Sequence, residues 1–195
     1  MKRIFFSVVI LAAMLAGCKK GENDPAISLK SRKARLVGEW KLSAAENTSM
    51  YDGYTEIYKF DDGKVTYTEG STTIIGTGDE TMIISKDGTY EIKRTITLGG
   101  STEMITEEGL WYFVDNNKAN DVSSKELVLK QCTFRSSTGG GYSSIVSYTG
   151  VTAGELDLST IDQLKSKELI FVWDETHTSG SNIRSTKGSS TYVQK

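Results

Sequence analysis

The chain has 195 residues, with 23 basic and 25 acidic side chains and a formal net charge of −2. A mildly acidic chain without a dense basic face gives little support to nucleic-acid binding, which depends on neutralising many phosphates. The length suits one domain with a sizeable core. Nineteen glycines, one proline and short alternating runs of Thr, Tyr, Ile and Val predict an all-β domain, a sandwich or a barrel.

The first eighteen residues have the pattern of an export signal. Lys2 and Arg3 precede an apolar run from Ile4 to Ala16 that is too short to span a bilayer, and small residues follow. The Leu-Ala-Gly-Cys ending resembles the lipobox of bacterial lipoproteins. This resemblance implies cleavage after residue 17 and acylation of Cys18, with diacylglycerol and palmitate as the expected lipids.

An acylated Cys18 would anchor the protein to a membrane, because two or three acyl chains hold a domain far more firmly than one. We therefore expect a signal peptide at residues 1–17, an acylated tether at 18–30 and the folded domain at 31–195. Lys19 follows the cysteine where some lipoproteins carry an inner-membrane retention Asp, so we expect the cell envelope and its outer membrane. Cys132 is the other cysteine, which excludes an intrachain disulfide in the mature protein.

A short helix is predicted before the sheet. Asp24 and Pro25 suit an N-cap and a first helical residue, and Ala26 to Leu36 would form a helix that ends near Gly38. The basic residues of this segment indicate a solvated face near the anchor, with contact to anionic lipid as the alternative. They are Lys30, Arg32, Lys33 and Arg35.

Strands follow in hairpin order from Gly38 onward. Asp62-Gly63, Asp87-Gly88 and Gly99-Gly100 are turn signals between alternating runs. Ser159 to Leu164 is predicted to be one helical turn with a hydroxyl cap. The expected strands are 40–44, 54–60, 65–68, 82–85, 89–97, 103–106, 110–114, 126–134, 143–148, 168–176 and 191–194. Strands in this order can close into an up-and-down barrel of about eight to ten strands.

Gly38-Glu39-Trp40 resembles the Gly-x-Trp motif of the first lipocalin strand, and the chain is similar to the lipocalin-like lipoproteins of Gram-negative bacteria over roughly Ser31 to Trp173. A second Gly-x-Trp begins at Gly109. The resemblance implies a lipocalin-like barrel in which Trp40 seals one end beneath an arginine of the last strand. Arg184 is the only late arginine and fits that role poorly, and the Thr-Asp-Tyr motif of the family is absent.

A barrel of this size has room for side chains or for one small ligand, so polar residues on its apolar faces are the candidate binding residues. Period two places Glu56 and Tyr58 on one face and Arg94 on another, each among apolar neighbours. Because a buried charge is costly unless it is paired, Glu56 and Arg94 are expected to bind each other, to line a wet cavity or to lie near the rim. Tyr112 completes the candidate set.

Residues for catalysis or metal binding are scarce. His177, the single histidine, ends a strand without a nucleophile elbow elsewhere in the chain, and Cys132 suits a small packed residue. The oxygen donors from Asp115 to Glu126 imitate a calcium loop, but Ala119 and Asn120 occupy positions that the motif needs for a ligand and a glycine. We therefore predict no enzyme, no cofactor and no metal site.

Two functions remain open. The first is a membrane-anchored lipocalin-like protein that binds a small, partly hydrophobic ligand in the barrel. The second is a lipid-anchored scaffold that contacts a protein or glycan through Gly/Ser-rich loops at Ser136 to Ser144 and Ser179 to Ser190.

Replacing Cys18 with Ser tests the predicted anchor. Because acylation needs the thiol, we expect the variant to lose all incorporation of labelled palmitate in bacterial cells and to leave the membrane fraction. Cys132→Ser is the control and should keep both properties. Equal labelling of the Cys18 variant and the wild type would contradict the prediction.

Overall fold

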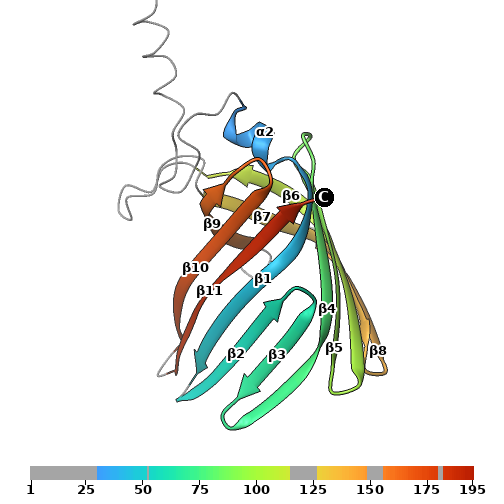
Figure 1. Ribbon diagram of the computed structural model, residues 1–195, viewed down its shortest axis with the longest axis vertical. Coiled ribbons are helices and arrows are strands. Elements are labelled where there is room, and N and C mark those ends of the chain that lie inside the picture. The colour runs from blue at the N-terminus through green and yellow to red at the C-terminus, as the bar shows by residue number, and fades with distance from the viewer. Residues whose placement is uncertain (1–29, 52, 115–126, 149–155, 180–181) are drawn as a thin grey trace, which may run out of the picture.

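The computed structural model describes the chain except for residues 1–29, 52, 115–126, 149–155 and 180–181. Within the described residues, one short helix precedes a sheet of eleven strands (Figure 1). The elements are α2 (Arg32–Leu36), β1 (Gly38–Tyr51), β2 (Tyr54–Asp61), β3 (Lys64–Glu69), β4 (Thr72–Ile84), β5 (Thr89–Leu98), β6 (Ser101–Phe113), β7 (Leu127–Gly139), β8 (Tyr142–Ser147), β9 (Leu156–Leu164), β10 (Glu168–Ser179) and β11 (Asn182–Gln194).

Ten of these strands form a closed antiparallel barrel, which confirms the predicted fold class. They pair in the order β6-β5-β4-β3-β2-β1-β11-β10-β9-β7, and β6 pairs with β7 to complete the ring. β8 extends the sheet beside the second half of β7. Closing the sheet on itself pairs the strand edges that an open sheet would leave exposed.

The ring is narrower at one end. There β1 pairs directly with β4, through Gly38–Lys41 and Thr81–Ile84, so the β2-β3 hairpin is left out and eight strands remain. This is the upper end in Figure 1, where α2 and the C-terminus lie, and we call it the closed end. The mouth is the opposite end, where the β1-β2, β3-β4 and β5-β6 turns lie.

The β2-β3 hairpin enters the barrel wall as a wedge between β1 and β4. Its turn residues Asp62 and Gly63 have positive φ angles of 42° and 87°, as the Asp-Gly signal predicts for a two-residue hairpin turn. The Asp62 amide donates to the Ser43 carbonyl at 2.9 Å, and the Gly78 amide donates to the Gly63 carbonyl at 2.9 Å. β1 has a register shift at Ser43, so the wall opens where the hairpin tip bonds to both neighbours.

Helix α2 lies over the closed end (Figure 1). Ser31 caps it, because its hydroxyl accepts a hydrogen bond from the Ala34 amide at 3.2 Å. Leu36 and Trp40 are fully buried beneath it, and the Trp40 indole donates to the Leu36 carbonyl at 2.8 Å. The tryptophan thus fills the narrow end of the barrel while its one polar atom is satisfied.

The arginines of this helix do not form the solvated face that the sequence predicted. Arg32 and Arg35 are only 5% exposed, and Arg35 donates to the Leu164 carbonyl, so they belong to the closed end rather than to a solvated face. Lys33 does remain exposed. Arg184 does lie on the last strand, β11, but it pairs opposite Tyr51 near the mouth, so it does not cover Trp40 as the lipocalin resemblance implies.

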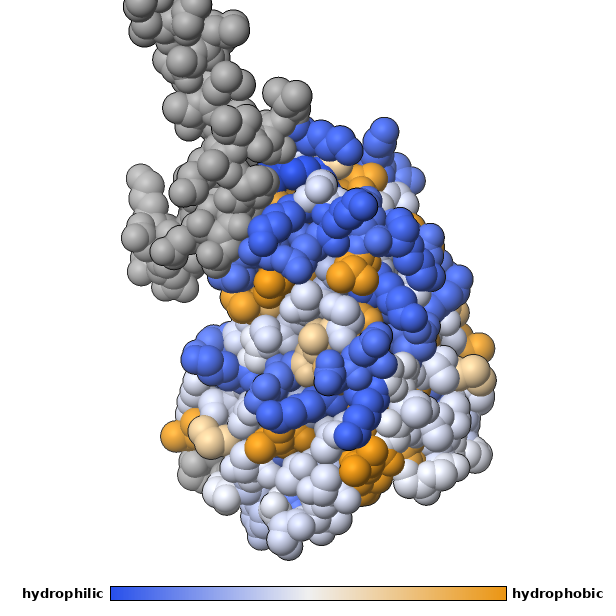
Figure 2. Space-filling model, viewed as in Figure 1, coloured by the Kyte–Doolittle hydropathy of each residue, from blue (hydrophilic) through white to orange (hydrophobic). Residues whose placement is uncertain are grey.

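The core fills the barrel from the closed end downward. Its members come from α2 and from all ten barrel strands, so the barrel has one continuous apolar interior above the wider half. The outer wall carries cross-strand ion pairs, and in Figure 2 hydrophilic side chains dominate the upper half of the visible face. The buried residues are Leu36, Trp40, Leu42, Phe60, Val65, Met82, Ile84, Tyr90, Ile92, Trp111, Val128, Ile161, Leu164, Leu169, Phe171 and Tyr192.

Three local predictions are wrong. Ser159 to Leu164 lies in β9 and is not a helical turn. The two strands expected at 103–106 and 110–114 form the single strand β6, which has a register shift between Glu108 and Gly109. The expected Gly/Ser-rich loops are largely strand, because Ser136–Gly139 ends β7, β8 follows after two turn residues, and β11 begins at Asn182. The scaffold hypothesis therefore loses the long loops on which it depended.

Other expectations fall on residues that the structure does not describe. They concern the leader, Cys18, the predicted helix start at Asp24 and the polar loop at 115–126. In the described ranges, no helix has the length and apolar character needed to cross a membrane.

Replacing Trp40 with Ala tests how far the barrel depends on its closed end. Truncating a fully buried tryptophan leaves a large cavity, so we expect a loss of about 3 to 5 kcal/mol in the free energy of unfolding. Urea unfolding followed by circular dichroism measures it. Tyr54→Ala, at a side chain that is 71% exposed, is the control and should change stability by less than about 0.5 kcal/mol. Similar losses in both variants would contradict this role for Trp40.

Candidate functional site

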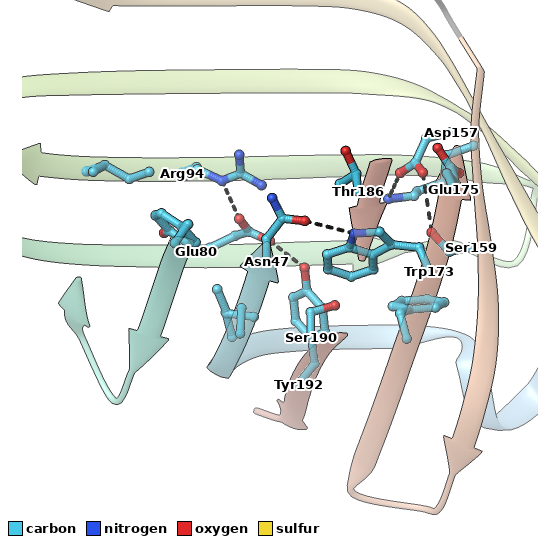
Figure 3. A pocket seen from close by; sticks show the side chains of 16 residues that line it. Asn47, Glu80, Arg94, Asp157, Ser159, Trp173, Glu175, Thr186, Ser190 and Tyr192 are labelled. Carbon is cyan, nitrogen blue, oxygen red and sulfur yellow. Dashed lines mark hydrogen bonds and ion pairs between the residues drawn. The ribbon is translucent and has the colours of Figure 1, made fainter. Parts of the chain in front are cut away.

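A cavity of about 470 Å³ lies inside the barrel, below the apolar core. Its volume is within the range of about 300 to 1,000 Å³ that is usual for small-molecule sites. Inward-facing residues from β1, β2, β4, β5, β7, β9, β10 and β11 line it (Figure 3). They are Leu42, Ala45, Asn47, Tyr58, Glu80, Arg94, Ile96, Lys130, Asp157, Ser159, Phe171, Trp173, Glu175, Thr186, Ser190 and Tyr192.

A buried carboxylate organises one wall of this cavity. Glu80 on β4 is 2% exposed, and its two oxygens have different partners. One accepts a hydrogen bond from Arg94 Nε on β5, which lies opposite it in the register, and the other accepts from the Tyr192 hydroxyl on β11 at 2.5 Å (Figure 3). A buried charge needs this kind of pairing to be tolerated. The network therefore joins β4 and β5 to β11, past the intervening strand β1.

The charges of this network support one another. Burial alone would lower the pKa of Arg94, but the neighbouring Glu80 carboxylate more than offsets this effect and raises it. Burial raises the pKa of Tyr192 well above its usual value, and the adjacent Glu80 raises it further. Arg94 therefore stays cationic and Tyr192 stays protonated, so the hydroxyl remains a donor to Glu80.

A second ion pair lies on the opposite wall. Lys130 on β7 contacts Asp157 on β9 at 2.6 Å, and the Ser159 hydroxyl donates to the other oxygen of Asp157 at 3.4 Å (Figure 3). Lys130 Nζ also lies 5.9 Å from the centre of the Phe171 ring, within the range of a cation-π contact. The cavity thus has charged groups on two walls, each already paired within the protein.

Trp173 forms part of the wall between these pairs. Its indole nitrogen donates to the Asn47 side-chain oxygen at 3.0 Å, and the Asn47 amide donates to the Ser49 hydroxyl at 3.2 Å. The ring packs against β11 at Gly188, where a Cβ atom would come within 2.5 Å of it. The glycine therefore makes room for a flat apolar surface that faces the cavity.

Polar pairs continue beside the cavity, on β5, β6 and β7. Arg135 contacts Glu107 at 2.5 Å, and Glu107 also accepts a hydrogen bond from the Tyr90 hydroxyl at 2.6 Å. Burial is the main reason why the pKa of Tyr90 is raised, and its bond to Glu107 adds to the effect. The interior is therefore apolar at the closed end and increasingly polar toward the mouth.

The predicted site residues are divided among three places. Tyr58 and Arg94 both line the cavity. Glu56 lies near the mouth instead, in a pocket of about 430 Å³ with Arg184, and Arg94 pairs with Glu80 rather than with Glu56. Tyr112 is a correction: it is 44% exposed and lies between inward-facing Trp111 and Phe113, so it faces outward. Any role of these residues in binding stays a prediction.

Several cavity residues were missed by the sequence analysis. Glu80 alternates with Gly78, Met82 and Ile84, so its period-two spacing could have placed it on the apolar face. Lys130 alternates with Val128 and Cys132, so the same spacing could have placed it on the inner face. Tyr192 and Asp157 depend on pairing between distant strands, for which the sequence has no local signal.

Metal and thiol chemistry find no support in the described part of the chain. No group of three His, Cys, Asp or Glu side chains is placed there to hold a metal ion. Cys132 is buried, and its sulfur donates to the Phe134 carbonyl at 3.3 Å, as suits a packed residue.

A protein-family model matches this chain. The family model described as "Domain of unknown function (DUF5004)" matches residues 19–170, which is most of the chain. No curated protein matches the chain.

Titration at high pH tests the network around Glu80. Unfolded tyrosine loses its proton near pH 10, whereas folded Tyr192 keeps it, so its contribution to stability is complete below about pH 10 and is lost as the pH rises. In Tyr192→Phe, the free energy of unfolding should fall less steeply above pH 10, by up to about 1.4 kcal/mol per pH unit.

Chemical denaturation between pH 8 and 12 measures these slopes. Tyr54→Phe, at an exposed position, is the matched control. An unchanged slope in Tyr192→Phe would show that this hydroxyl is not held in its protonated form.

Proposed function

Because the chain belongs to the DUF5004 family, whose description names no activity, we propose a function from the cavity itself. The protein binds one small, partly apolar ligand inside its barrel, as a membrane-anchored lipocalin-like lipoprotein. The observation that carries this proposal is the cavity of about 470 Å³ with an apolar roof and polar walls. Side chains fill the closed end but leave this space beside it.

The lining suits a ligand with both apolar and polar parts. Leu42, Ile96, Phe171 and the ring of Trp173 offer apolar surface, which gains free energy when it is removed from water together with the ligand. The paired charges of the walls are fixed by hydrogen bonds, so they can orient polar groups of a ligand without large rearrangement. This combination is usual in small-molecule sites.

The anchor is part of the proposal and rests on the lipobox-like ending at Cys18. The described chain begins at Lys30, beside the helix that covers the closed end (Figure 1). A tether to Cys18 therefore joins the barrel at the end opposite the mouth. The ligand would enter and leave through the end that lies away from the tether.

Filling the cavity tests the binding proposal. Ala45 lines it, whereas Ala44 is the neighbouring residue on the outer face of β1. We expect Ala45→Phe to weaken ligand binding at least tenfold because the added ring occupies the space, and Ala44→Phe to leave binding unchanged. A chain that begins at Lys19 is suitable, since the core lies between Leu36 and Tyr192.

Native mass spectrometry of this chain after gentle purification detects a retained ligand, and an apolar fluorescent probe gives the affinity. A wild-type protein that neither carries nor takes up any small molecule would contradict the proposed function. So would equal binding by the two phenylalanine variants, because the ligand would then lie outside the barrel.

A further inference from the structure

The cavity contains two hydrogen-bond donors that the protein itself leaves unused. Arg94 contacts Glu80 through Nε, and within the described part of the chain its two terminal nitrogens have no acceptor. Its side chain is 41% exposed although the residue lies on the inner face of the barrel, so the exposed part faces the cavity. The Tyr58 hydroxyl likewise has no hydrogen-bond partner among the described residues.

These two donors belong to the same side of the cavity. Arg94 and Tyr58 line the same space and lie close enough to influence each other electrostatically. Burial raises the pKa of Tyr58, so its hydroxyl keeps the proton that it can donate. The bond from Nε to Glu80 fixes the guanidinium, and Tyr192 fixes Glu80 in turn. A ligand atom would therefore meet donors that are already in position.

The charge balance decides which acceptor fits these donors. Glu80 already neutralises Arg94, Lys130 already neutralises Asp157, and Glu175 adds a further carboxylate to the lining. The cavity thus has three acidic and two basic side chains, so an added carboxylate would be brought into a site without net positive charge. An ammonium group, like Arg94, can only donate hydrogen bonds, so it offers no acceptor to Arg94 or Tyr58. An uncharged oxygen accepts hydrogen bonds and adds no charge to the cavity.

Resting on the proposed function, we propose that Arg94 and Tyr58 form a subsite for an uncharged oxygen acceptor of the ligand, such as an amide carbonyl. The apolar part of the ligand then lies along Phe171 and the ring of Trp173. The terminal nitrogens of Arg94 and the Tyr58 hydroxyl make no hydrogen bond within the described residues, so the subsite is free to select among ligands of equal apolar size. These donors discriminate well between ligands, because a bound ligand without an acceptor would leave them buried and unpaired, which costs free energy.

Three probes with the same chain and different head groups test this assignment. They are decanamide, decanoate and decylamine, titrated at pH 7.5 into the chain that begins at Lys19 by isothermal titration calorimetry. We expect decanamide to bind most tightly, about tenfold more so than either charged probe. Arg94→Lys keeps the charge beside Glu80 but removes the fork of nitrogens, and Tyr58→Phe removes only a hydroxyl. Each should weaken decanamide binding by about three- to tenfold.

Controls come from the mouth pocket, where Arg184→Lys and Tyr54→Phe change the same residue types outside the cavity and should leave all affinities unchanged. Thermal melting shows whether each variant folds. If Arg94→Lys does not fold, the binding of decanamide to Tyr58→Phe tests the subsite. Tighter binding of decanoate or decylamine would overturn the subsite. Equal binding of all three probes, unaffected by either variant, would overturn it and leave the proposed function standing. Binding of none would overturn both.

Discussion

The packing of Trp40 against Leu36 at the narrow end of the barrel is the contact on which the rest of the structure depends. With eight strands at this level, one indole and the helix above it fill the interior, and the indole nitrogen finds its acceptor in the Leu36 carbonyl. The barrel is therefore filled at this end. Within the described residues, the cavity below it does not continue past Trp40.

The change from apolar to polar along the interior follows from the same geometry. Where the ring is narrow, side chains from opposite walls touch, and only apolar residues can be buried there without partners. Where β2 and β3 join the ring, the barrel is wider, and charged side chains there find partners on other strands. Glu80 binds Arg94 on the neighbouring strand β5 and Tyr192 on β11, which lies beyond β1, and Lys130 binds Asp157 on the neighbouring strand β9. The polar walls are thus rigid, a property that favours selective binding.

The parts of the fold that could be predicted are those with a local chemical cause. Asp62-Gly63 and Gly99-Gly100 fix their turns through positive φ angles, whatever the rest of the chain does. The helical turn predicted at Ser159 to Leu164 rested on a hydroxyl cap, whereas these residues pair with β10 through a register shift that brings both Ile161 and Leu164 inward. Glu56 and Arg94 were predicted to bind each other, to line a wet cavity or to lie near the rim, and the register of β4 against β5 gives Arg94 a different partner, Glu80. Such pairs depend on strand register, which single residues do not reveal.

The wedge-like β2-β3 hairpin marks the level at which the barrel changes from eight strands to ten. Its tip is held by two backbone hydrogen bonds, to Ser43 and from Gly78, and neither bond depends on side-chain identity. The strands that seal the narrow end pair with one another without it. Two more residues at the tip would enter between Lys41 and Thr81 and separate β1 from β4, so the length of this hairpin sets the level at which the barrel narrows.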